Sequence, residues 1–157
     1  MTDSPPSAPP LAFRLDEARG GTELAWDRQR NGPSSSEGSW IHLSTLQDSH
    51  RRWIESELEE APDLCEALLA GETRPRCFVV DQGLLMILRG VNLNPGAQAE
   101  DMVSLRMFLD GSRMISSSRR HVFAVDELRD RCEQERGPSS PSEAFVELAS
   151  ALLHRIN

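Results

Sequence analysis

Histidines are the side chains of this 157-residue chain best suited to binding a metal ion or transferring a proton. None of them is spaced four residues from another histidine or from a cysteine, the spacing that would place two ligands of a local zinc site on one helix face. We interpret His42 as a structural histidine in a strand. His50 is predicted to lie on a solvated helix face with Asp48 and Glu57, where weak metal binding is the alternative. The four candidates are His42, His50, His121 and His154.

No catalytic arrangement of serines or cysteines can be identified in the sequence. A nucleophile elbow, a dinucleotide-binding glycine motif, a P-loop, a zincin helix and an EF-hand loop are all missing. The runs Ser34–Ser36 and Ser116–Ser118 are predicted to be loops without a neighbouring base. We therefore predict that the chain is not an enzyme, and a small hydrolase is an alternative that would need carboxylates converging in one cleft. Three cysteines are expected to be small core side chains: Cys65, Cys77 and Cys132.

Arginine supplies all 17 basic residues, and the absence of lysine excludes Schiff-base chemistry and a lysine-dependent phosphate loop. Several arginines could gather to hold an anion or an acidic partner. The interpretation that we favour is internal ion pairing or subunit contact, because Glu72, Glu100 and Asp101 are close in sequence. The residues concerned are Arg74, Arg76, Arg89, Arg106, Arg119 and Arg120, with His121 following.

Composition limits the class of protein. The apolar residues amount to 38% of the chain, and its length fits one domain with one core. The net charge of −8 disfavours nucleic acid and anionic membranes as partners of the whole chain. No apolar run approaches the ~20 residues that cross a bilayer, and no secretory signal can be recognised, so we expect a cytosolic location.

The first third of the chain is predicted to contain a tail, short strands and a helix. Residues 1–10 are proline-rich and are expected to be a disordered tail that precedes a single domain over residues 11–157. Strands are predicted at 11–15, 23–26 and 40–43, with a surface loop at 28–39. Ser44 and Gln47 suggest a capping box for a helix whose apolar face includes Trp53 and Ile54.

The middle of the chain is predicted to contain a second helix and two hairpins. Pro62 suits the first turn of the helix, and Gly71 its end. The runs 77–80 and 84–88 are continuously apolar, which indicates a hairpin covered by helices on both faces. Residues 103–109 alternate instead, so the hairpin that they form with 113–116 through Asp110-Gly111 is expected to be half buried.

The last part of the chain is predicted to contain one further strand and two helices. The strand is expected at 122–125, followed by a helix capped by Asp126 with Leu128 and Cys132 one turn apart. Ser140-Pro-Ser-Glu143 indicates a capped helix with an apolar stripe that continues to Ile156. Because no stop signal follows, we expect residues 140–157 to be the start of a longer helix.

Several motifs in this order resemble the cytosolic amino-terminal domain of the ZntB branch of the CorA-type divalent-cation transporters. They are Trp40-x-His42-Leu43, Glu72-Thr-Arg-Pro-Arg76, Leu88-Arg-Gly-Val-Asn-Leu-Asn94 and Glu100-Asp-Met-Val-Ser-Leu-Arg106. The resemblance covers residues 40–157. It implies an α/β/α sandwich with a mixed, largely antiparallel sheet, which agrees with the doubly covered strands predicted above.

The resemblance also implies a homopentamer whose domains form a funnel, with zinc as the transported ion and divalent cations as partners. No bound cofactor is expected. The membrane would be reached only through a further C-terminal segment, which places the domain on the cytoplasmic side of the inner membrane. A stand-alone regulatory or interaction module of the same fold is the alternative.

A structural or interface role is expected at the family-motif positions, and no catalytic or metal-ligating role is assigned to any residue. The string Gly90-Val91-Asn92 matches the family's pore triplet, but we predict a strand-to-loop connection without a pore role. The positions are Glu72, Thr73, Arg74, Pro75, Arg76, Arg89, Asn92, Asn94, Asp101 and Arg106.

Overall fold

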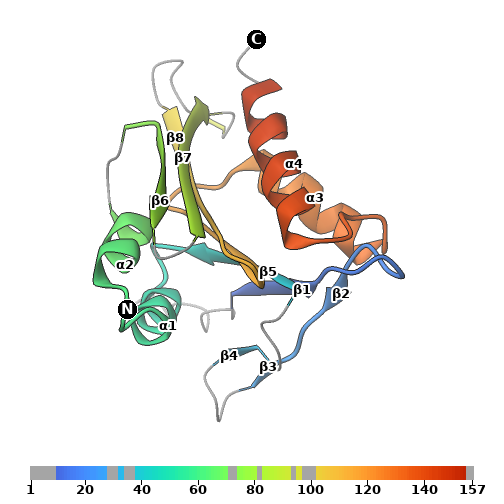
Figure 1. The fold of residues 1–157 in the computed structure, drawn as a ribbon. Coiled ribbons are helices and arrows are strands. Elements are labelled where there is room, and N and C mark those ends of the chain that lie inside the picture. Colours follow the sequence, from blue (N-terminus) through green and yellow to red (C-terminus); the bar gives the residue numbers. More distant parts are fainter. Residues whose placement is uncertain are drawn as a thin grey trace, which may run out of the picture.

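The computed structural model describes residues 10–27, 32–33, 38–70, 74–80, 83–92, 95–96 and 102–154. Its centre is a seven-stranded sheet in the order β2-β1-β5-β9-β8-β7-β6 (Figure 1). The strands are β1 (Leu11–Arg14), β2 (Thr22–Glu23), β5 (Ser39–Ser44), β6 (Arg76–Val80), β7 (Gly83–Val91), β8 (Met102–Leu109) and β9 (Arg113–Ser118).

Helices cover both faces of the sheet, with α1 and α2 on one side and α3 and α4 on the other (Figure 1). Only β5 and β9 pair in parallel, and the other strand pairs are antiparallel. The predicted α/β/α sandwich with a mixed sheet is therefore confirmed. The helices are α1 (Asp48–Glu57), α2 (Pro62–Leu69), α3 (Phe123–Glu133) and α4 (Pro141–His154).

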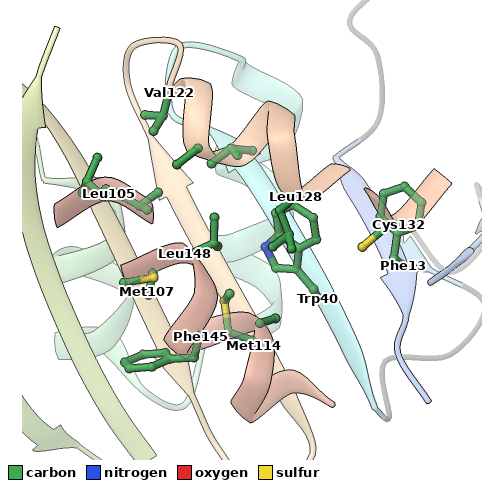
Figure 2. Close-up of a cluster of buried hydrophobic side chains, with 14 of the residues drawn as sticks. Phe13, Trp40, Leu105, Met107, Met114, Val122, Leu128, Cys132, Phe145 and Leu148 are labelled. Carbon is green, nitrogen blue, oxygen red and sulfur yellow. The ribbon is translucent and has the colours of Figure 1, made fainter. Parts of the chain in front are cut away.

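Each face of the sheet has its own hydrophobic core. Beneath α3 and α4, Trp40 and Met107 of the sheet pack against Leu128 and Leu148 (Figure 2). Beneath α1 and α2, side chains such as Ile41 and Ile87 meet the two helices. Since each strand between the helices contributes alternate residues to both cores, the central strands are buried on both faces.

The two predicted hairpins exist, and β7 is covered on both faces as predicted, but the predicted burial of β6 and of the second hairpin is wrong. β8 and β9 were expected to be half buried, and they lie at the centre of the sheet with Arg106 and Phe108 enclosed. β6 was expected to be covered on both faces, and it is an edge strand with Val79 77% exposed. The periodicity of apolar residues indicates which side chains share a face of a strand. Burial of that face depends on the position of the strand in the sheet, which is set by tertiary contacts.

The serine run Ser116–Ser118 was predicted to be a loop, and it is the buried end of β9. These hydroxyls tolerate burial because they are hydrogen-bonded. Ser117 Oγ donates to the carbonyl of Leu68 at 2.7 Å, which ties β9 to α2. A polar sequence therefore forms a core strand.

Several predicted boundaries are also wrong. Ser44 ends β5 and does not cap α1, whose N-cap residue Gln47 has no side-chain hydrogen bond. The predicted strand 122–125 is the first turn of α3, with Val122 as its N-cap. The predicted surface loop 28–39 includes β4 (Gly32–Pro33), which pairs with β3 (Trp26–Asp27) in a separate ribbon. The tail 1–9 and Gly71 lie outside the described residues.

Helix α4 begins as predicted. Ser140 Oγ accepts a hydrogen bond from the N–H of Glu143 at 3.2 Å. The Glu143 carboxylate reaches back to the N–H and hydroxyl of Ser139, one residue before the expected partner, and these bonds lower its pKa. Leu153 is 48% exposed and so leaves the predicted apolar stripe. Residues after His154 lie outside the described part.

The loop after β1 packs closely against the end of α3. Gly21 has a φ of +134°, and a β-carbon placed there would lie 2.6 Å from Cα of Cys132. Gly20 also accepts a hydrogen bond from the N–H of Gly137 at 2.6 Å. Only glycine fits position 21 without moving backbone.

A Gly21→Ala variant is therefore expected to lose about 2 kcal/mol of stability, since it combines an unfavourable φ with overpacking. Urea denaturation followed by circular dichroism measures this loss. Gly111→Ala is the matched control, because nothing lies within 4 Å of a β-carbon at Gly111. Equal losses in the two variants would contradict the close packing.

Candidate functional site

The described family-motif residues lie on the three strands at the β6 side of the sheet. Arg74 and Pro75 are exposed just before β6, and Arg89 is exposed in β7. Asn92 is buried directly after β7, and Arg106 is fully buried in β8. Glu72, Thr73, Asn94 and Asp101 lie outside the described residues, so their predicted roles are not observed.

Arg106 is held beneath the end of α2. Its Nη2 donates to the carbonyl of Ala70, the residue that ends the helix. Removal from water lowers its pKa. In the strand register Ile87 lies between Arg106 and Arg76, which is exposed with its guanidinium 5.2 Å from the Phe78 ring. Arg106 thus tethers α2 to the sheet and is not available to a ligand.

The arginines expected to gather are only partly brought together. Arg74, Arg89, Arg119 and Arg120 are exposed at one end of the sheet, the end at which β7 and β9 finish. Arg106 lies deeper on the same sheet. Arg106 is therefore not part of the group of exposed arginines.

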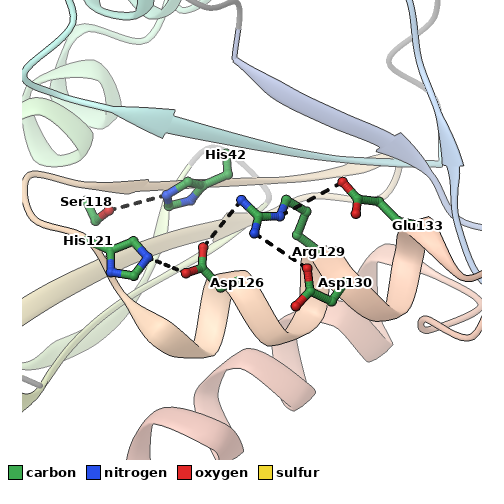
Figure 3. Close-up of polar contacts among 7 residues, drawn as sticks. All are labelled: His42, Ser118, His121, Asp126, Arg129, Asp130 and Glu133. Carbon is green, nitrogen blue, oxygen red and sulfur yellow. Dashed lines mark hydrogen bonds and ion pairs between the residues drawn. The ribbon is translucent and has the colours of Figure 1, made fainter. Parts of the chain in front are cut away.

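A second polar cluster lies at the carboxyl ends of β5 and β9 and is organised around His42 (Figure 3). Trp40 Nε1 donates to Ser116 Oγ at 2.9 Å, and Ser116 Oγ lies 2.7 Å from His42 Nδ1. His42 Nε2 lies 3.3 Å from Ser118 Oγ. Burial, with smaller contributions from His50 and His121, lowers the pKa of His42 to about 3. The prediction of a hydrogen-bonded structural histidine is confirmed.

The prediction for His50 is wrong. It was expected on a solvated helix face, and it is only 7% exposed. Its Nδ1 accepts a hydrogen bond from the N–H of Ser44 at 2.9 Å, so the imidazole links α1 to the end of β5. In the predicted capping box the Gln47 side chain would have accepted a hydrogen bond from the N–H of Ser44, and His50 accepts it instead.

His121 and Arg129 share the carboxylate of Asp126 in the first turn of α3 (Figure 3). Arg129 also lies within 3.5 Å of Asp130 and 4.0 Å of Glu133. All of these side chains are partly or largely exposed, so the network is a surface feature of modest energy.

Among the described residues, no group of three or more His, Cys, Asp or Glu side chains is arranged so that it could hold a metal ion. Of the cysteines predicted to be core side chains, Cys132 is buried in one core and Cys65 packs against the other at intermediate exposure, but Cys77 is exposed. Burial raises the pKa of Cys132 to about 11, which leaves an unreactive thiol.

The seven-stranded mixed sheet between helix pairs is the fold of CorA soluble domains, as comparison with known proteins shows. The family model of the CorA-like Mg²⁺ transporter proteins matches residues 35–157. The chain belongs to this family.

The chain is similar in sequence to two kinds of CorA-family protein. It is 39% identical over 122 residues to the divalent cation transporter CmaX of Pseudomonas aeruginosa, covering 77% of this chain and 37% of that protein. It is 32% identical over 142 residues to the zinc transport protein ZntB of Pectobacterium atrosepticum, covering 90% and 42%. The chain thus spans about two fifths of the length of these relatives.

Solved structures agree with this assignment. Full-length CmaX superimposes with a TM-score of 0.81 at 34% identity, over 96% of this chain and 47% of that one. The cytoplasmic domain of ZntB from Vibrio parahaemolyticus gives 0.77 at 23% identity, over 92% and 57%, which supports the fold. The resemblance to a ZntB-like cytosolic domain is confirmed.

Gly90-Val91-Asn92 forms the end of β7 and the start of the following connection, as predicted. A β-carbon at Gly90 would lie 2.6 Å from Cδ1 of Leu152 in α4. The absence of a side chain at Gly90 therefore allows α4 to pack closely against β7. In the described part of the chain, no helix combines the length and the apolar character needed to cross a bilayer.

Proposed function

We propose that this chain is the cytosolic domain of a CorA-family divalent-cation transporter, on the cytoplasmic side of the inner membrane, with zinc as the transported ion. The family match over residues 35–157 carries this proposal, and the ZntB and CmaX relatives support the class of cargo. The domain would act without catalysis, by assembly and by its electrostatic field.

Charge supports the electrostatic part of the proposal. The net charge is −8, and a pentamer would multiply it five-fold around a common axis. Acidic walls raise the local concentration of cations, and salt weakens the effect over a Debye length of ~8–10 Å. The acidic residues Asp48 and Glu55 of α1 are exposed and so contribute to this field.

Gating would require the domain to favour one state of the transporter. A cation bound between subunits shifts a closed-to-open equilibrium only by the difference between its affinities for the two states. The proposal therefore extends to assembly, cation attraction and transmission of a conformational change.

A domain exchange tests the function. We expect a chimera in which this chain replaces the matching part of CmaX to retain divalent-cation uptake in cells, because both sequences belong to one family and the two structures superimpose closely. Uptake of zinc and magnesium by membrane vesicles is the measurement. The control is CmaX without its matching part.

A chimera that reaches the membrane as an intact oligomer but transports no cation would contradict the proposal. The gene provides a separate check. Two apolar segments of ~20 residues after residue 157 would support a transporter, whereas a stop codon there would favour a stand-alone module.

A further inference from the structure

Three arginines fall in one row across the end of the sheet. The register pairs Arg76 with Ile87, and continued past the start of β6 it brings Arg74 level with Arg89. Arg89 pairs with Ser104 of β8. The β8–β9 register, continued past Ser118, brings Arg119 level with Ser104. Arg89 and Ser104 are therefore a paired position of β7 and β8, and Arg74 and Arg119 lie just beyond the ends of the two flanking strands, β6 and β9.

Spacing in this row is set by the sheet. Neighbouring strands lie about 4.8 Å apart, so Arg74 and Arg89 start from positions about 5 Å apart, and Arg119 begins about 10 Å from Arg89. Directly opposed residues project from the same face, and like charges in such pairs destabilise a sheet. An anion between the guanidinium groups would remove this repulsion.

The arginines of this row reach solvent. Arg74, Arg89 and Arg119 are exposed, as is Arg120 beside them. Among the described residues, the ion pairs of arginine involve Arg19, Arg113, Arg129 and Arg131.

Ser104 adds a hydrogen-bonding group to this end of the sheet. It lies between Arg89 and Arg119 in the row and is partly exposed, so its hydroxyl can donate to an oxygen atom.

We propose that this row, Arg74, Arg89 and Arg119 with Ser104, binds a phosphate-bearing anion at the end of the sheet. Arginine suits phosphate because its planar fork donates two parallel hydrogen bonds to one group. The spacing of two close arginines and one about 10 Å away fits one phosphate group held by the pair and a second negative group at Arg119. The site is independent of ion transport.

Two sources of the phosphate are compatible with this chemistry, a free anion and a lipid headgroup. Pyrophosphate titrated into the chain by calorimetry tests the first, and flotation with vesicles of phosphatidylglycerol, compared with phosphatidylcholine, tests the second. We expect at least one probe to bind with a dissociation constant below ~1 mM at low salt, and binding to weaken as salt is added.

Substitutions locate the site. Arg74→Gln, Arg89→Gln and Arg119→Gln should each weaken binding by about ten- to a hundred-fold, the usual loss for one hydrogen bond to a charged group, and the triple variant should abolish it. Arg14→Gln is the matched control, because Arg14 is exposed and lies at the opposite end of the sheet, where β5 begins.

Binding of pyrophosphate alone assigns the site to a free anion, and binding of vesicles alone assigns it to the membrane surface. Failure of both probes would overturn the proposal, as would binding that the triple variant and the Arg14 control reduce equally. All of the variants change exposed residues, so unchanged circular dichroism is expected and confirms that each is folded. Loss of binding with intact cation uptake would leave the proposed transport function standing.

Discussion

Between pH 6.5 and about pH 3, the wild-type chain is expected to lose stability more steeply with falling pH than a His42→Gln variant. The pKa of His42 falls from 6.5 to about 3 on folding, chiefly because the imidazole is buried. In this window the unfolded chain binds a proton at His42 and the folded chain does not. Acid therefore favours unfolding by up to ~1.4 kcal/mol per pH unit, and this contribution vanishes above pH 6.5.

Hydrogen bonding explains why the neutral imidazole fits. Ser116 Oγ accepts from Trp40 Nε1, so its own proton is free to be donated to His42 Nδ1. His42 Nε2–H then donates to Ser118. Protonation at Nδ1 would direct a second N–H at Ser116 Oγ and remove the acceptor of the Ser116 hydroxyl proton.

Urea denaturation of both proteins at intervals across this pH window measures the difference in unfolding free energy. His121→Gln is the control for loss of an imidazole as such, since the His121 side chain is 48% exposed. Parallel stability curves for the wild type and the His42→Gln variant would show that His42 becomes protonated without cost in the folded state.

Local patterns predicted most elements of the fold. Pro62 marks the start of α2, Ser140 and Pro141 mark the start of α4, and the Asp110-Gly111 turn joins β8 to β9, as the sequence indicated. These signals act within a few residues, where backbone preference and capping dominate. The two-faced sheet also followed from apolar runs in adjacent strands.

Burial was less predictable, because it depends on which strand lies at the edge. The apolar sequence Cys77–Val80 suggested a central strand, yet β6 has one neighbour and stays exposed. Ser116–Ser118 suggested a loop, yet β9 lies between β5 and β8. Strand order follows from contacts between distant segments, and no period within one segment encodes it.

The polar residues illustrate the same limit. His42 was assigned correctly because one histidine in an apolar strand needs hydrogen-bond partners wherever it is buried. His50 was missed because the helix pattern gave no sign that its ring would reach back to Ser44. The row of Arg74, Arg89 and Arg119 could not be predicted, because the strand register that aligns these residues is known only once the strands are paired.

The second large effect is expected at Arg106, where an Arg106→Ala variant should lose about 3 kcal/mol or more of unfolding free energy. The side chain is fully buried in β8, and its guanidinium donates to the carbonyl of Ala70 at the end of α2. The last carbonyls of a helix have no partner within the helix, so this bond satisfies one of them. Alanine would leave both a void and an unsatisfied carbonyl.

An Arg106→Met variant separates these two contributions. Methionine refills much of the volume but donates no hydrogen bond, so an intermediate loss is expected. In both variants, amide hydrogen exchange should accelerate more in α2 than in α4, because only α2 loses its tether.

Arg89→Ala is the control, since Arg89 is exposed on the same sheet face of the adjacent strand, and a change within about 0.5 kcal/mol is expected there. If Arg106→Ala changed stability as little as Arg89→Ala, α2 would be held by its apolar face alone, through residues such as Leu64 and Leu68.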